Sequence, residues 1–267
     1  TVTHRGTTSV CDLWVRHGRV ERLEPEVALP SGATPREIDG RGLWLLPGVI
    51  DSHVHFRDPG FPAKGTMHSE SRAAVAGGVT TVFDMPNTMP SITNTERLDA
   101  KREYVAGRAW CDIGLYVGGT KTNIAELAAL ELEPNVCAVK IFAGSSTGDL
   151  LVEDDESLEA VMRSGRRAIC YHSEDEYRLQ ARKPMFTPGM PHINHQEWRD
   201  VETAMLGTRR LMALARKTGR RAEAELPDIL AFLFIAKRIS IVFGSQGNLH
   251  KSISLAMMLF MTSVVPP

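Results

Sequence analysis

The sequence is poor in features that would point to several protein classes. Its 267 residues carry a formal net charge of −1, so we expect no strongly basic surface and no nucleic-acid partner. The four cysteines are scattered and form no CxxC pair, which fits reduced thiols in a cytoplasmic protein better than a disulfide framework. No signal peptide opens the sequence, and since Thr1 is not methionine we expect a few leading residues to be missing.

Long apolar runs are also lacking. The longest apolar stretch without a charge, residues 253–265, is shorter than the ~20 residues that a membrane-spanning helix needs. The stretch 229–243 is interrupted by Lys237 and Arg238. We therefore predict no membrane span. The sequence also lacks the GxGxxG and GxxxxGK[ST] motifs, which weakens the case for a doubly wound nucleotide-binding sheet.

The texture of the sequence changes near residue 46. Residues 1–46 predict a small β substructure whose short strands are joined by turns rich in proline and glycine. Residues 47–221 alternate short apolar runs with helix-compatible stretches, which indicates a parallel sheet with helical crossovers. The predicted strands are 10–16, 19–23 and 43–46, then 48–56, 79–85, 112–117, 136–142 and 167–171, and helices are expected at 69–76 and 95–106.

Polar residues stand where several of these strands end. His53 and His55 close the first run of the second region, Asn87 follows the next, Lys140 lies near the end of the fourth, and His172 follows the fifth. Chemistry at the carboxyl ends of successive strands is typical of a TIM-type barrel. The predicted fold is therefore α/β, an incomplete (β/α) barrel with about five of eight units, preceded by the small β substructure.

Four of these residues favour a metal site. On a strand, His53 and His55 project from the same face and are able to hold one ion together. Lys140 lies within an otherwise apolar strand, where an ammonium is costly to bury unless it is paired, neutralised or modified. A carbamate formed from its amine and carbon dioxide would bridge two metals, with His172 as a ligand of the second. Chance packing of the histidines and a lysine that reaches solvent are the alternatives.

Two further residues are candidates for substrate binding. Arg57 follows the histidine pair and is suited to hold a carboxylate through its bidentate fork, and Asn87 would add an amide hydrogen bond. Anchoring of their own loops is the alternative for both. The acidic run 174–176 is interpreted as a solvated helix start, with support of the metal site as its alternative.

Together these residues resemble the amidohydrolase superfamily and, within it, the dihydroorotases. The resemblance covers about residues 38–221. It is carried by LPGVIDSHVHFRDPG at 46–60, DMPNT at 84–88, VKIF at 139–142 with GSSTG at 144–148, and HSEDE at 172–176. Hydantoinases and allantoinases share the metal residues but generally lack the arginine after the second histidine.

The resemblance implies a set of roles. His53 and His55 would bind one Zn²⁺, a carboxylated Lys140 would bridge, and His172 would bind a second Zn²⁺. Arg57 and Asn87 would hold the carboxylate of a small-molecule substrate. The implied reaction is the reversible closure of N-carbamoyl-aspartate to dihydroorotate in pyrimidine biosynthesis. The implied assemblies are a homo-oligomer or a complex with a carbamoyltransferase.

The sequence departs from the family after Arg221. The family would supply a metal-binding histidine after the sixth strand and a catalytic aspartate after the eighth, and neither is recognised in residues 222–267. A complete barrel takes about 250 residues, more than remain after residue 46. We expect this tail to be a frame-shifted or misassembled end, with natural truncation and divergent closure as alternatives. An allantoinase or hydantoinase, and a non-catalytic assembly partner, stay open as alternative functions.

Overall fold

The computed structural model describes residues 1–4, 6–144, 149–225 and 241–243. The chain divides into two compact units, Thr1–Val49 and Ile50–Pro267. Each unit is described separately. Most of the tail that the sequence left unassigned lies outside the described residues.

The first unit consists of two antiparallel hairpins. Strand β1 (Val2–His4) pairs with β2 (Thr7–Ser9), and β3 (Asp12–Arg16) pairs with β4 (Arg19–Glu24). His17 and Gly18 form the two-residue connection of the second hairpin with φ angles of 50° and 73°, the left-handed values that such turns require. The first hairpin was not predicted.

The strand expected at residues 43–46 is not formed. Only Leu45 makes a bridge, to Val2, in which its carbonyl accepts a 3.0 Å hydrogen bond from the Thr3 amide. Trp44 and Leu46 are exposed, so a short run of apolar residues alone did not make this segment part of a ladder.

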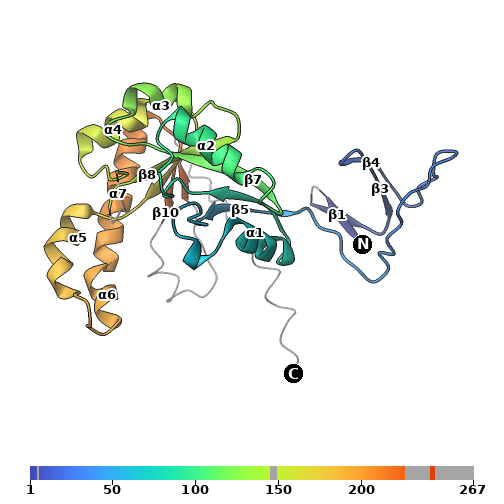
Figure 1. Cartoon of the computed structure of the whole chain (residues 1–267), viewed down its shortest axis with the longest axis horizontal. Helices are drawn as coiled ribbons and strands as arrows, with labels where there is room; N and C mark the ends of the chain where they lie inside the picture. The colour runs from blue at the N-terminus through green and yellow to red at the C-terminus, as the bar shows by residue number, and fades with distance from the viewer. Residues whose placement is uncertain (5, 145–148, 226–240, 244–267) are drawn as a thin grey trace. The chain divides into compact units, whose positions relative to one another are not determined.

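The second unit is built on a seven-stranded sheet in the order β11-β10-β9-β8-β7-β6-β5. Strands β6 to β10 pair in parallel, and β11 pairs antiparallel with β10. The sheet curls, with helices grouped along it (Figure 1), and forms an incomplete barrel of TIM type, as predicted. The strands are β5 (Val49–Val54), β6 (Val79–Asp84), β7 (Asp112–Gly118), β8 (Val136–Phe142), β9 (Ile169–His172), β10 (Ala222–Glu225) and β11 (Ile241–Phe243).

Five of the described α-helices of this unit, α1, α2, α4, α5 and α7, begin at conventional capping residues. Side chains of Thr66, Asn94, Asp154, Asp175 and Asp200 each accept a hydrogen bond from a backbone amide in the first turn of their helix. The α-helices are α1 (Met67–Ala76), α2 (Thr95–Val105), α3 (Ile124–Leu130), α4 (Asp155–Arg163), α5 (Glu176–Arg182), α6 (Ile193–Trp198) and α7 (Val201–Thr218). Short 3-10 helices are η1 (Pro62–Lys64) and η2 (Lys183–Met185).

The core lies between the sheet and the helices, and strand β8 shows how it forms. Val139 and Ile141 are fully buried and join the main core with residues of α3, α4 and α7. Ala138 belongs to a second cluster with Tyr116 and Cys170 on the opposite face of the sheet. This alternation with a period of two places Lys140 on the inner face, away from the helices.

Strand β10 extends the sheet beyond the region that the sequence assigned. Residues 222–225, placed in the unassigned tail, form a parallel strand beside β9, with Ala222 opposite Ile169 and Glu225 opposite His172. The strand was missed because it reads Ala-Glu-Ala-Glu, without the β-branched apolar run that marked the others.

Candidate active site

The two histidines at the end of β5 face each other. The Nε2 atoms of His53 and His55 lie 2.9 Å apart, and their ring centroids are separated by 4.8 Å. Two ligands of a tetrahedral zinc ion, each about 2.0–2.1 Å from the metal, stand roughly 3.4 Å apart. The imidazoles therefore bring their Nε2 atoms to a common point, and this donor pair would fit a metal ion.

Asn87 fixes the orientation of the second histidine. The Oδ1 atom of Asn87 lies 2.8 Å from Nδ1 of His55, so it accepts a hydrogen bond from that nitrogen, and Nε2 is then the nitrogen with a lone pair suited to a metal. Asn87 is buried. The prediction from the sequence that Asn87 binds substrate stays a prediction, and the contact with His55 adds a role in orienting the histidine.

Lys140 lies on the inner face of β8 and is completely buried. Its Nζ atom lies 3.5 Å from Sγ of Cys170 and 5.0 Å from the centre of the Phe142 ring. Cys170 is the residue opposite Lys140 on β9. The lysine is therefore held in the barrel interior rather than extended to solvent.

His172 ends β9 opposite Phe142, against which its ring is stacked at 6.0 Å between centroids. Since Cys170 and His172 are two residues apart on one strand, they project from the same face, as do Lys140 and Phe142. Phe142 thus contacts both the lysine and the histidine, and the two candidate metal residues share one side of the sheet.

Electrostatic effects relate the histidines to the lysine. Partial loss of hydration, followed by the nearby His53, Lys140 and Arg57, lowers the pKa of the His55 imidazole to about 3. Burial lowers the pKa of His172, and Lys140 adds to that effect while Glu174 opposes it. The positive charge of Lys140 thus acts on both histidines, and the neutral imidazole that results is the form that coordinates metals.

Glu174 is a member of this site that the sequence interpretation placed wrongly. It is 1% exposed rather than solvated, its Oε2 lies 2.7 Å from Nε2 of His172, and it also pairs with Arg199. Burial tends to raise the pKa of the Glu174 carboxyl, but hydrogen bonds from His172 and Arg199 hold it at about 2. The helix start itself is confirmed, because Asp175 caps α5.

Arg57 lies in a tight loop after the histidine pair. Its φ angle is 60°, an uncommon value for a residue with a side chain, and its carbonyl accepts a 2.9 Å hydrogen bond from the Phe61 amide. The loop packs on the loop that carries Asn87, since the Met89 amide donates to the Pro59 carbonyl at 3.1 Å. The two loops that carry the candidate substrate residues therefore support each other.

We also searched the described residues for clusters of metal ligands, membrane-spanning helices and cavities. No group of three or more His, Cys, Asp and Glu side chains among them is arranged to hold a metal ion. Lysine is not one of these residue types, and a carboxylated Lys140 would be an additional metal ligand.

No helix in the part of the chain that the structure describes is both long and apolar enough to cross a membrane. A cavity of about 530 Å³ lies elsewhere, and none of the predicted site residues lines it.

Known proteins similar to this chain include enzymes of two kinds. The chain is 30% identical to a dihydroorotase from Methanosarcina mazei over 67% of its own length and 39% of that protein. It is also 30% identical to an allantoinase from Deinococcus radiodurans, over 78% of its own length and 47% of that protein. The chain thus spans less than half the length of these curated relatives.

Solved structures give the same fold. An L-hydantoinase from Arthrobacter aurescens superposes with a TM-score of 0.70 and 24% identity, covering 80% of this chain and 48% of that one. Residues 44–181, more than half of the chain, match the amidohydrolase family and include all the candidate metal and substrate residues. This chain belongs to the amidohydrolase family.

Proposed function

We propose that this chain carries the metal-binding and substrate-carboxylate part of a zinc-dependent cyclic amidohydrolase of the dihydroorotase type. The observation that carries the proposal is the pair of imidazole nitrogens of His53 and His55, 2.9 Å apart at the end of β5. His53 and His55 would hold one ion, Lys140 as its carbamate would bridge, and His172 would hold the second.

The metal contributes one kind of chemistry when bound: as a Lewis acid it makes water a nucleophile near neutral pH and polarises the amide carbonyl under attack. Other residues of the chain would orient the histidines that hold the metal. Asn87 holds the His55 ring in place through the 2.8 Å contact, and Glu174 does the same for His172 at 2.7 Å.

Lys140 requires a chemical change to take part. Its neutral amine would attack carbon dioxide, form an N–C bond and release a proton, which leaves an anionic carbamate on the side chain. Full burial on the inner face favours this reaction, since removal of an ammonium from water is costly and the neutral amine is the form that reacts. Carbamate formation would replace the positive charge of Lys140, which acts on His55 and His172, by a negative charge that would stabilise two bound Zn²⁺ ions.

Arg57 supports the choice of substrate. Arg57 follows His55 by two residues, and its positive charge is one of the causes that lower the pKa of that histidine. A guanidinium beside a metal site is suited to a ring substrate with a carboxylate, which dihydroorotate carries and hydantoin and allantoin lack. The similarity to proteins named allantoinase keeps that reaction as the second candidate.

Metal content and substrate choice test the proposal together. The purified chain should contain about two zinc ions, and His53→Ala and Lys140→Ala should lose at least one, whereas His195→Ala, outside the site, should retain both. Zinc should fall when the protein is prepared without carbon dioxide and recover with bicarbonate. If the purified, unaltered chain contains no zinc, that result would instead support a non-catalytic assembly partner.

The substrate is tested separately. Dihydroorotate should be hydrolysed in preference to allantoin and hydantoin, and Arg57→Gln should raise KM for dihydroorotate by roughly 10- to 100-fold. A preference for allantoin that Arg57→Gln leaves unchanged would replace the dihydroorotase assignment by the allantoinase one.

A further inference from the structure

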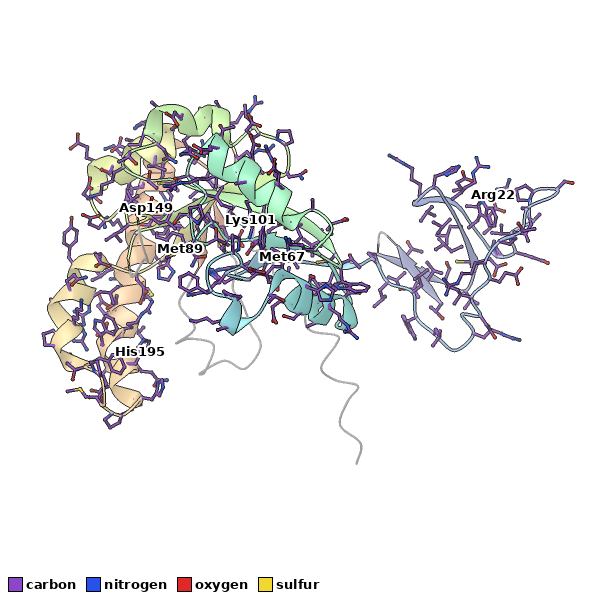
Figure 2. All side chains as sticks on the ribbon, viewed as in Figure 1. Arg22, Met67, Met89, Lys101, Asp149 and His195 are labelled. Atoms are coloured by element: carbon purple, nitrogen blue, oxygen red, sulfur yellow. The ribbon has the colours of Figure 1, made fainter. Side chains whose placement is uncertain are left out.

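A buried ionic cluster lies directly behind the loop that carries Arg57. Its centre is an ion pair in which Nζ of Lys101 lies 2.8 Å from Oδ2 of Asp84, with side chains 2% and 0% exposed. Lys101 comes from α2 and Asp84 ends β6. Lys101 is labelled in Figure 2, within the second unit. Neither residue belongs to the metal or substrate set described above.

The ion pair closes a ring of polar contacts around residue 57. On one side, the Phe56 amide donates to Oδ1 of Asp84 at 3.2 Å. On the other side, Nζ of Lys101 donates to the Asp58 carbonyl. Both backbone neighbours of Arg57 are therefore anchored to the same buried pair, one through the carboxylate and one through the ammonium.

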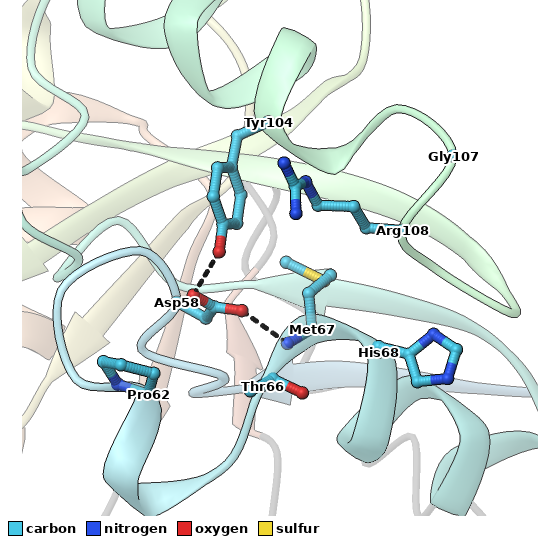
Figure 3. A pocket seen from close by; sticks show the side chains of 8 residues that line it. All are labelled: Asp58, Pro62, Thr66, Met67, His68, Tyr104, Gly107 and Arg108. Atoms are coloured by element: carbon cyan, nitrogen blue, oxygen red, sulfur yellow. Dashed lines mark hydrogen bonds between the residues drawn. The ribbon is translucent and has the colours of Figure 1, made fainter.

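The side chain of Asp58 extends the cluster to two helices. Its carboxylate accepts hydrogen bonds of 2.6 Å from the Met67 amide at the start of α1 and from the Tyr104 hydroxyl (Figure 3). Tyr104 and Lys101 are three residues apart on α2 and thus lie on one face of the helix. Helices α1 and α2 are both attached to the same short loop.

These contacts stabilise an unfavourable backbone conformation at Arg57. Arg57 adopts the left-handed conformation with φ of 60°, which L residues with side chains keep only when their surroundings enforce it. Burial raises the pKa of the Asp84 carboxyl, and Lys101 opposes that rise. The ammonium thus offsets part of the cost of burying the carboxylate while it also binds the Asp58 carbonyl.

We propose that Lys101 is a positioning residue that, with Asp84 and Asp58, holds the loop of Arg57 in the conformation that presents its guanidinium to substrate. The inference rests on the proposed function for the role of Arg57, but the restraint on the loop is a property of the fold itself. Lys101 touches neither substrate nor metal in this account.

Hydrogen–deuterium exchange of the whole chain tests the restraint without any need for activity. In Lys101→Met the amides of Phe61 and Met67, which donate to Arg57 and to Asp58, should exchange roughly tenfold faster. Arg220→Met is the matched control, because it breaks an ion pair with Glu131 of similar burial, 4% and 0% exposed, far from this loop. If the exchange of the Phe61 and Met67 amides, relative to that of the other amides of the same variant, rises equally in Lys101→Met and Arg220→Met, the proposal is overturned.

Kinetics test what the restraint is for. With a carboxylate-bearing ring substrate, Lys101→Met should lower kcat/KM by about 10- to 100-fold, mainly through KM, and should add little in an Arg57→Gln background. Full additivity of the two substitutions would show that Lys101 does not act through Arg57. A chain that binds neither zinc nor such a substrate would refute the proposed function, while the exchange result still decides the restraint.

A milder variant keeps the test decisive if Lys101→Met does not fold. Tyr104→Phe removes only the hydroxyl that donates to Asp58. It should raise exchange at Met67, and the Arg108→Met control, beside the same ring but without a bond to Asp58, should not. An unchanged Met67 amide in Tyr104→Phe would count against the cluster as the restraint.

Discussion

Two ion pairs of similar burial lie at opposite ends of the strands in the described part of the second unit. Lys101 and Asp84 lie at the carboxyl end of β6, beside the loop of Arg57. Arg220 and Glu131 lie at the amino ends of the strands, where Glu131 also accepts hydrogen bonds from the Arg166 and Arg167 amides just before β9. In barrels of this type the first end carries chemistry and the second carries stability.

The difference lies in what each pair holds. Glu131 and Arg220 connect α3 with the segments that lead into β9 and β10, so the pair ties together parts of the framework. Lys101 and Asp84 surround one residue with an unusual backbone conformation. The same physical device thus serves the scaffold at one end and a single side chain at the other.

The largest expected effect comes from breaking the framework pair. Arg220→Met leaves the carboxylate of Glu131 buried without its guanidinium and should reduce the free energy of unfolding by about 3–5 kcal/mol. Urea denaturation measures this. The exposed pair of Arg163 and Glu159 provides the control, since Arg163→Met should change stability by less than about 1 kcal/mol. Equal losses in both variants would contradict the contrast.

A second prediction concerns close packing at the site end. Gly207 in α7 lies against the backbone after His172, and a Cβ atom there would be 2.7 Å from the Glu174 nitrogen. Gly207→Ala should destabilise the fold by roughly 1–3 kcal/mol, although alanine is the better helix former by about 1 kcal/mol. Thermal unfolding checks this. An increase in stability would show that the helix moves away without penalty.

A third prediction separates metal binding from stability. Glu174→Gln removes the carboxylate that holds His172 and should weaken zinc binding by about 10- to 100-fold. Competition with a chelator of known affinity measures the change. Glu202→Gln, in the first turn of α7, is the control and should leave zinc affinity unaltered. Unchanged affinity in Glu174→Gln would mean that His172 is not held for a metal.

The smallest effect is expected at a partly exposed pair. A hydrogen bond from Arg178 is the main cause that holds the pKa of Asp200 below its ordinary value. The resulting stability is present above the unfolded pKa of about 3.9 and is lost as pH falls toward the folded pKa. Asp200→Asn keeps the cap of α7 but should make acid unfolding less steep. An acid limb identical to that of the unaltered chain would contradict this.

The sequence was sufficient to predict the strands and helices that depend on residues close together in the chain. Strands β5 to β9 were predicted within a few residues because each is a short apolar run, and the two helices at 69–76 and 95–106 were found from their periodicity and glycine stops. The fold class is confirmed. The metal roles of His53, His55, Lys140 and His172 stay predictions; the structure puts Lys140 and His172 on the adjacent strands β8 and β9, and the two histidines at the end of β5, three strands from β8.

Residues that depend on distant partners were not found. Lys101 sits in a polar helix and resembles a solvated lysine, and only the fold shows that Asp84 lies 2.8 Å away. The one available signal was the carboxylate of Asp84 at the end of an otherwise apolar strand. Glu174 was misjudged for the same reason, because Arg199, which keeps it charged, lies well beyond it in sequence.

Strand β8 has a consequence for how this chain tolerates change in length. Its residues alternate between the helical layer, which takes Val139 and Ile141, and the interior, which takes Lys140. Insertion or deletion of a single residue within the strand would turn the lysine toward the helices and bring valine into the interior. Substitutions of similar volume are tolerable there, whereas single-residue insertions and deletions should be confined to the connecting loops.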